Sequence, residues 1–171
     1  MTKSPETLAK LFGYRFDNPG FLKQALVHRS AGSRNNERLE FLGDAVLGAV
    51  IAHEVYARHP KAREGELSRM RSTLVRRESL AELADGLDIG TYLKLGPGER
   101  KSGGHQRQSI LADAFEAVLG AIYLDGGFEP CRQTIVALFA EKLDAIADLD
   151  HLKDHKTRLQ EYLQSQSKPL P

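Results

Sequence analysis

The longest regular pattern of apolar residues in the sequence lies in segment 36–58. Apolar residues recur there at intervals of three and four, a spacing typical of one face of an α-helix. The expected core stripe of this helix is Leu39, Leu42, Val46, Ala49 and Val50. Pro60 follows and is expected to end the helix, because proline cannot continue the helical hydrogen bonds.

Three acids interrupt this apolar helix. Glu37, Glu40 and Asp44 occupy positions i, i+3 and i+7, which places them within roughly 60° of one another around the helix axis. A carboxylate in apolar surroundings is unfavourable unless it is paired with a base, protonated or bound to a metal. For this stripe alone, surface salt bridges with neighbouring arginines or lysines are the simpler interpretation.

A second apolar helix with an acidic stripe is expected over residues 110–124. Only Asp113 and Glu116 are charged there, and they are i, i+3 neighbours on one face. If the two stripes face each other, their carboxylate oxygens form a ligand set suited to Mg²⁺ or Mn²⁺. Two matched stripes therefore favour a metal site over separate surface salt bridges.

The rest of the pattern predicts further helices. Helix starts are expected at Ser4-Pro5, Asn18-Pro19 and Glu64, and an amphipathic helix is expected over 72–87. The alternation of β-branched residues that signals strands is absent. The predicted fold class is therefore all-α.

Segment 95–107 is the clearest candidate for a flexible loop, because it is rich in glycine and contains a proline. Arg100, Lys101 and Arg107 make it basic, and it directly precedes the second acidic helix. Such a loop is well placed to contact phosphates. An ordinary solvated loop explains the same composition equally well.

The composition limits the classes of function without choosing one. The chain has 171 residues, enough for one domain with a sizeable core, and its 24 basic and 23 acidic residues give a net charge of +1. This balance gives no global attraction to nucleic acid, so any charge that binds RNA has to be local. Cys131 is the single cysteine, which excludes an intramolecular disulfide, and it is expected to be a packing residue. No apolar run approaches the ~20 residues of a membrane span, and no signal peptide is recognisable, so a cytoplasmic location is expected.

Four motifs, in sequence order, resemble the nuclease domain of the ribonuclease III family. They are Asn-Glu-Arg-Leu-Glu-Phe-Leu-Gly-Asp-Ala at 36–45, Glu-Gly-Glu-Leu-Ser at 64–68, Leu-Gly-Pro-Gly-Glu at 95–99 and Ile-Leu-Ala-Asp-Ala-Phe-Glu-Ala at 110–117. A lone Glu-x-x-Glu pair would be a weak signal, whereas four ordered motifs are specific. The resemblance implies the helical fold of that nuclease domain, assembled as a homodimer.

The resemblance also implies a Mg²⁺ site in which Mn²⁺ can substitute. The acids that match its metal ligands are Glu40, Asp113 and Glu116. Asp44 and Glu116 match its catalytic residues. Whether Asp44 binds metal directly or holds a metal-bound water stays open at this point.

Three further positions acquire roles from the resemblance. Glu37 and Glu64 match outer acidic positions, for which outer-shell or RNA-contact roles are expected. Phe41 projects near the acidic edge of its helix, where it is either a residue at the margin of the core or an exposed interface anchor. The family favours the anchor, because this position inserts into a cavity of the partner subunit and the reverse contact follows from two-fold symmetry.

The implied activity is hydrolysis of both strands of double-stranded RNA. The products are expected to carry 5′-phosphate and 3′-hydroxyl ends with short 3′ overhangs. Processing of rRNA and mRNA precursors is the expected role, with one active centre of the homodimer acting on each strand.

The chain is expected to divide into three parts. Residues 1–147 resemble the nuclease domain, 148–155 a polar linker, and 156–171 the first helix of a double-stranded RNA-binding domain. Such a domain needs three strands and a second helix after this point, so the module is expected to be incomplete. Tight, independent RNA binding is therefore not expected from it.

Other classes of function account for parts of the pattern. An all-α, Mg²⁺-dependent nucleoside triphosphate pyrophosphohydrolase also uses paired acids on helices, although closer spacing of the two stripes is expected there. A di-iron carboxylate bundle fits less well, because neither stripe carries a Glu-x-x-His pair. An inactive nuclease-like RNA-binding module has no need to keep the four acids.

Overall fold

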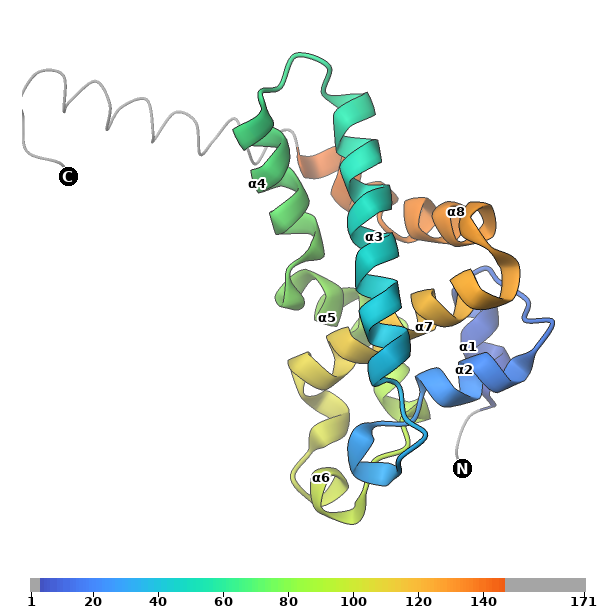
Figure 1. Ribbon diagram of the computed structural model, residues 1–171. Helices are drawn as coiled ribbons and strands as arrows, with labels where there is room; N and C mark the ends of the chain where they lie inside the picture. The colour runs from blue at the N-terminus through green and yellow to red at the C-terminus, as the bar shows by residue number, and fades with distance from the viewer. Residues whose placement is uncertain (1–3, 147–171) are drawn as a thin grey trace, which may run out of the picture.

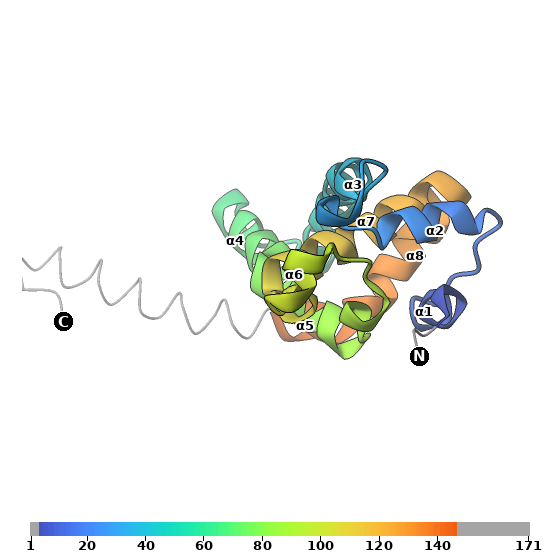
Figure 2. The ribbon, with the colours of Figure 1, turned by 90° about the horizontal axis from the view of Figure 1, so that it is seen from below.

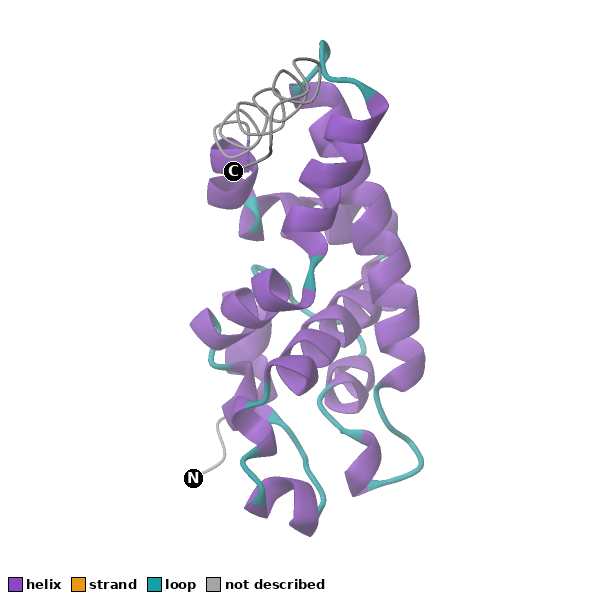
Figure 3. Cartoon of the chain, turned by 90° about the vertical axis from the view of Figure 1, so that its left-hand side faces the viewer, coloured by secondary structure: helices purple, strands orange, loops and turns teal. Residues whose placement is uncertain are grey.

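The computed structural model describes residues 4–146, and every regular element in this range is a helix (Figure 3). The α-helices of this range are α1 (Pro5–Leu11), α2 (Pro19–Ala25), α3 (Glu37–Arg58), α4 (Glu64–Val75), α5 (Arg77–Gly86), α6 (Pro97–Lys101), α7 (Gln108–Gly126) and α8 (Phe128–Leu138). Its 3₁₀ helices are η1 (Arg29–Ala31), η2 (Ile89–Tyr92) and η3 (Gly104–Gln106). The predicted all-α class is therefore confirmed for the described residues. None of these helices combines the length and the apolar character needed to cross a membrane.

Helices α3 and α7 form the centre of the fold. Figure 1 shows α3 running from the upper end of the molecule to below its middle, where it crosses α7. In the view of Figure 2, α3 lies on one side of α7, and α5 and α8 lie on the other. The fully buried side chains of α7 include Ala114, Phe115, Val118, Leu119 and Ile122. Because α7 is covered by α2, α3, α5 and α8, it is apolar almost all round, as a helix in the middle of a core must be.

The crossing of α3 and α7 is close because each helix presents a glycine to the other. A Cβ atom on Gly43 would lie 1.8 Å from the carbonyl oxygen of Glu116. A Cβ atom on Gly120 would lie 2.2 Å from the carbonyl oxygen of Leu39. No side chain fits at such distances, so the two backbones are in direct contact. This contact brings the acidic stripes of both helices to the same place.

A short extended pairing joins the end of α2 to the segment before α6. The Lys94 N–H donates to the Leu26 carbonyl at 2.8 Å, and the His28 N–H donates to the Lys94 carbonyl at 3.0 Å. The Gly96 N–H donates to the Ser30 hydroxyl at 2.9 Å. A Cβ atom on Gly96 would lie 2.2 Å from the Ser30 carbonyl oxygen, so this contact also requires glycine. The pairing fixes the turn that leads into η1.

The prediction of a flexible loop over 95–107 is wrong for most of that segment. α6 begins at Pro97, since proline suits the first turn of a helix, and Gly103 turns the chain into η3 with a φ of +77°. The proline and glycines that predict irregular structure therefore start and end short helices here.

Two other expectations need correction. Ala49 is exposed, whereas Leu47 and Ile51 are fully buried, so the buried face of α3 is rotated from the predicted stripe. The amphipathic segment 72–87 is interrupted at Arg76, whose extended backbone ends α4 and precedes α5. The predicted linker and RNA-binding segment, which begin at residue 148, lie outside the described residues.

We expect Gly43→Ala to destabilise the domain severely, because its methyl group would overlap the backbone of α7. Overpacking of this kind costs about 3 kcal/mol or more where backbone has to move. Urea denaturation followed by circular dichroism measures the loss.

Gly86→Ala is the matched control, because a Cβ atom on Gly86 of α5 would meet nothing within 4 Å. It should leave the free energy of unfolding unchanged or raise it by up to about 1 kcal/mol. Equal effects of the two substitutions would show that the crossing does not depend on glycine.

Candidate metal centre

Three carboxylates from α3 and α7 converge at the helix crossing. One oxygen from each of Glu40, Asp113 and Glu116 lies within 4.8 Å of the other two. Glu40 comes from the first turn of α3, and the other two acids lie one turn apart on α7. Within residues 4–146, none of the three makes a hydrogen bond or an ion pair. The structure thus brings together the three predicted metal ligands.

Burial and mutual repulsion raise the pKa values of this cluster. The pKa of Glu116 is raised to about 8, mainly by burial. The negative charges of Asp44, Glu40 and Asp113, in that order, add to the effect. Burial also raises the pKa of Glu40, with a further contribution from the charge of Asp113. The charged forms are therefore unfavourable without a nearby cation.

The pKa of Asp113 is raised too, and again burial is the main cause. Electrostatic interactions with Arg77, His28 and Arg29 act in the opposite direction without overcoming it. These basic groups lie near the cluster, but none of them forms an ion pair with it. A set of carboxylate oxygens without histidine or cysteine suits a hard divalent cation such as Mg²⁺, so the residues present fit the implied metal.

Asp44 and Glu37 flank the inner cluster on α3. Asp44 is outside the 4.8 Å group, although its charge makes the largest electrostatic contribution to the raised pKa of Glu116. Glu37 is exposed and forms an ion pair with Arg29 at 3.7 Å. It also accepts a hydrogen bond from the side-chain amide of Asn35 at 3.2 Å. The geometry thus separates three inner acids from two outer ones.

Glu64 lies apart from the cluster of its own chain. It is the first residue of α4 and is exposed, and it accepts a hydrogen bond from the Ser68 hydroxyl at 2.7 Å. Figure 1 shows the start of α4 at the far end of α3 from α2. From Glu40 to the end of α3 the helix axis alone extends roughly 27 Å. No side chain spans that distance.

Phe41 is 79% exposed, which excludes the interpretation of a residue at the core margin. A surface hollow of about 600 Å³ lies beside it, and its apolar lining includes Phe21, Leu42 and Leu124. A large exposed aromatic next to an apolar hollow is typical of a contact surface.

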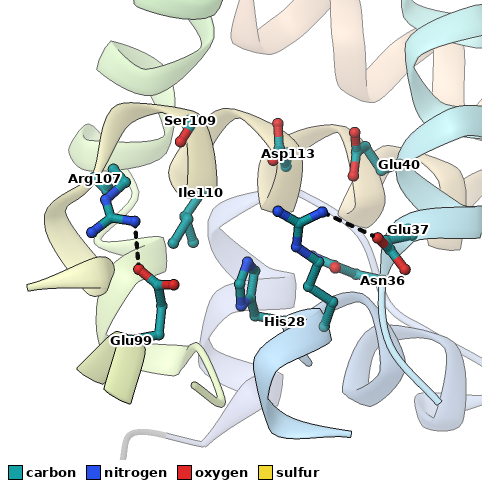
Figure 4. Close-up of a pocket in the computed structure, with 10 residues that line it drawn as sticks. His28, Asn36, Glu37, Glu40, Glu99, Arg107, Ser109, Ile110 and Asp113 are labelled. Atoms are coloured by element: carbon teal, nitrogen blue, oxygen red, sulfur yellow. Dashed lines mark ion pairs between the residues drawn. The ribbon is translucent and has the colours of Figure 1, made fainter. Parts of the chain in front are cut away.

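A pocket of about 290 Å³ opens beside the cluster (Figure 4). Its acidic wall includes Glu40 and Asp113 from the cluster itself. Its basic wall consists of His28, Arg29 and Arg107. The pocket therefore offers positive charge and hydrogen-bond donors directly beside the carboxylates, as a site for a phosphate group requires.

The three basic residues predicted to contact RNA differ in their surroundings. Arg107 forms an ion pair with Glu99 at 2.6 Å and donates to the Ser102 hydroxyl at 3.3 Å. Arg100 and Lys101 are exposed in the last turn of α6. Of the three, only these two have side chains without an acidic partner in the part of the chain that the structure describes.

Sequence analysis missed His28, Arg29 and Glu99 as pocket residues. The sequence at 28–30 predicts only a helix end, and Glu99 resembles a solvated surface acid. These residues meet in the pocket because segment 94–96 pairs with 26–30, a contact between distant segments that carries no local signal.

Comparisons with known proteins identify the family of this chain. A sequence profile described as Ribonuclease-III-like matches residues 18–143. Ribonuclease 3 of Nitrosococcus oceani is 57% identical over 173 residues, which cover 100% of this chain and 74% of that protein. Ribonuclease 3 of Alkalilimnicola ehrlichii is 56% identical over 171 residues, with coverage of 100% and 75%.

Solved structures give the same result. The nuclease domain of ribonuclease III from Campylobacter jejuni, in which a flexible region is involved in dimer formation, matches with a TM-score of 0.79 and 40% identity. The match covers 81% of this chain and 97% of that one. Dicer from Pichia stipitis matches with a TM-score of 0.61 and 28% identity, covering 77% and 58%.

The match to a solved nuclease domain shows that this all-α fold, with the acidic cluster at its central crossing, is the fold of a nuclease domain. The profile match and the relatives that match over the whole of this chain show that it belongs to the ribonuclease III family. It is therefore an RNA endonuclease, and the predicted family is confirmed.

We expect the metal-free protein to lose stability as the pH rises from about 4.5 to about 8. The raised pKa of Glu116 means that the folded state binds a proton that the unfolded state has already released, so the free energy of unfolding falls across this window. Water screens a partly buried carboxylate, so the total loss is on the order of 1–2 kcal/mol. Urea denaturation in the presence of a chelator, at constant ionic strength, measures it.

Glu116→Gln should flatten this pH profile, because glutamine keeps the shape of glutamate without its charge. The variant should also be more stable than the wild type at pH 8 without metal. Parallel profiles of the two proteins would contradict the raised pKa.

Proposed function

We propose that this chain is a Mg²⁺-dependent endoribonuclease that hydrolyses both strands of double-stranded RNA. The products would carry 5′-phosphate and 3′-hydroxyl ends with short 3′ overhangs. The observation that carries the proposal is the convergence of Glu40, Asp113 and Glu116 within 4.8 Å, without a basic partner among residues 4–146. Bringing these carboxylates together destabilises the fold, and a bound cation would offset their repulsion.

Hydrolysis of a phosphodiester needs an activated water and compensation of negative charge in the transition state. Bound divalent metal supplies both, with Mg²⁺ as the expected ion and Mn²⁺ as a substitute. Glu40, Asp113 and Glu116 would hold the metal. Asp44 and Glu116 carry the catalytic roles, with Asp44 close enough to influence the protonation of Glu116.

The outer residues have supporting roles in this proposal. Glu37 lines the pocket and holds Arg29 at its mouth, which fits an outer-shell or RNA-contact role. Glu64 lies too far from the cluster of its own chain for metal binding, so an RNA contact is the better assignment. Arg100 and Lys101 are free to meet phosphates, whereas Arg107 would have to exchange Glu99 for a phosphate.

A homodimer follows from the same proposal. The exposed Phe41 and the apolar hollow beside it lie on one surface, so a two-fold axis would place each aromatic ring in the hollow of the other subunit. Leu124 and Phe21 in the hollow supply the apolar lining that such an anchor needs. Two active centres on one face would then allow one cut in each strand.

The processing of rRNA and mRNA precursors and a cytoplasmic location stay predictions. The family assignment argues against the pyrophosphohydrolase alternative. The inactive-module alternative does not account for three acids kept together at an energetic cost. A direct assay decides between them: long double-stranded RNA is incubated with and without Mg²⁺, and the product lengths are measured.

Glu116→Gln should lower the cleavage rate by roughly three orders of magnitude, because losing a metal ligand removes several kcal/mol of transition-state stabilisation. Binding of RNA by the folded variant should persist. The increase in melting temperature that Mg²⁺ gives the wild type should shrink, because the ion stabilises only the state that presents its site.

Glu141→Gln is the matched control, since Glu141 is exposed and lies outside the cluster and the pocket. It should cleave at the wild-type rate. Near-normal cleavage by Glu116→Gln at saturating Mg²⁺ would remove Glu116 from the active site.

Phe41→Asp should give a folded monomer that no longer makes paired cuts in both strands. A carboxylate in place of an interface anchor leaves the hollow empty and adds an unpaired charge, at a cost of about 2 kcal/mol or more to association. Analytical ultracentrifugation reports the assembly state, and circular dichroism reports folding.

Leu11→Asp is the control, because Leu11 is also an exposed apolar residue, at 48%, but on α1. It should remain dimeric. A Phe41→Asp dimer of unchanged affinity would exclude Phe41 from the interface.

A further inference from the structure

His28 stands in the pocket beside the metal centre with one ring nitrogen already bound. Its Nδ1 accepts a hydrogen bond from the Ser30 N–H at 3.2 Å and lies 2.8 Å from the Ser30 hydroxyl. The backbone N–H can only donate, so Nδ1 must be an acceptor. His28 thereby caps η1, and its ring is tied to the turn that carries it.

This contact determines the chemistry of the other nitrogen. A neutral imidazole with an acceptor at Nδ1 carries its proton on Nε2. Nε2 is then a fixed N–H donor at the end of the ring that points away from the Ser30 turn. Within residues 4–146, Nε2 makes no hydrogen bond.

Backbone contacts fix the turn that carries the ring. The His28 N–H is bound to the Lys94 carbonyl at 3.0 Å. The Ser30 hydroxyl that faces Nδ1 also accepts the Gly96 N–H at 2.9 Å. Gly96 packs so closely on the Ser30 carbonyl that no larger residue fits there. Two segments distant in sequence therefore fix the direction of one imidazole.

The pocket shows what this donor faces. Figure 4 shows the His28 ring beside Glu99 and below the α7 residues Ile110 and Asp113. The arginines of the pocket are engaged with acids, Arg29 with Glu37 and Arg107 with Glu99. The imidazole donor is uncommitted and stands beside the ligand set of the proposed metal.

We propose that His28 is a substrate-positioning residue, whose Nε2–H donates to a phosphate oxygen of the RNA backbone next to the phosphodiester that is cut. The assignment rests on the proposed function, since it requires RNA in the pocket. A donor to phosphate fits better than a metal ligand, because Nε2 carries the proton and His28 is not part of the group of converging ligand atoms. The hydrogen bond fixes the register of the strand over the carboxylates.

Two substitutions distinguish the role of Nδ1 from the role of Nε2. His28→Asn keeps an acceptor near the position of Nδ1, and asparagine is a preferred capping residue, but it loses the donor in the pocket. His28→Gln reaches as far as Nε2 with an amide N–H and loses the cap. We expect His28→Asn to lower kcat/KM on a short RNA duplex with one cleavage site by about 10- to 100-fold, the usual value of a hydrogen bond to a charged group. His28→Gln should retain more activity with a lower melting temperature.

A binding measurement without cleavage tests the same contact. In a Glu116→Gln background, His28→Asn should weaken the Kd for the duplex by about tenfold, as expected for one charge-assisted hydrogen bond. With Glu116 intact, the shift in melting temperature caused by Mg²⁺ should be the same in the wild type and in His28→Asn. If both His28 variants lost activity equally and in proportion to their loss of stability, His28 would be only a capping residue and the proposal would be wrong. A normal kcat/KM in His28→Asn would also overturn the proposal.

Two further outcomes are distinguishable. If the wild type does not cut duplex RNA with Mg²⁺, the proposed function fails and this inference fails with it. If the wild type cuts but His28→Asn changes only the response to Mg²⁺, His28 acts on the metal and not on RNA, which overturns the inference alone. If His28→Asn does not fold, a protein with histidine methylated at Nε2 at this position is used instead. The methylated residue keeps the acceptor at Nδ1 and cannot donate a hydrogen bond from Nε2.

Discussion

The direct backbone contact between α3 and α7 determines where the acids of this protein lie. Gly43 and Gly120 let the backbones of the two helices touch, since a Cβ atom at either position would overlap the backbone of the other helix. Gly43 follows Glu40 by three residues, and Gly120 follows Glu116 by four, so each glycine lies one turn from an acid. The contact that joins the helices is therefore also the contact that assembles the cluster.

Close approach concentrates negative charge where water is scarce. The pKa of Glu116 is raised to about 8 for this reason, mainly by burial and further by repulsion from the neighbouring acids. A polyanion such as RNA cannot approach three carboxylates unless their charge is offset. The opposite wall of the pocket is correspondingly basic, and its arginines are already paired with Glu37 and Glu99, which a phosphate can replace.

The sequence allowed the prediction of the helical class and of the two acidic stripes, because both follow from local periodicity. The choice of Glu40, Asp113 and Glu116 among the acids of these stripes depended on the resemblance to the family. Apolar spacing places Glu40 on one face of a helix, and Asp113 and Glu116 on one face of another, whatever the tertiary structure. The roles of Gly43 and Gly120 could not be predicted, since a glycine within an apolar helix reveals nothing of the backbone opposite it. The prediction for segment 95–107 failed for a related reason: Pro97 and Gly103 give the same local signal whether they bound a helix or a loop.

Two separate backbone contacts set the geometry of the site. The glycine crossing places Asp113, and the pairing of 26–30 with 94–96 places His28. The Glu99–Arg107 ion pair then links the second contact to the start of α7, so the two sides of the pocket cannot move independently without breaking that ion pair. Backbone contacts of this kind leave no flexible side chain to adjust. A site built on them keeps its distances, which hydrolysis at a defined phosphodiester requires.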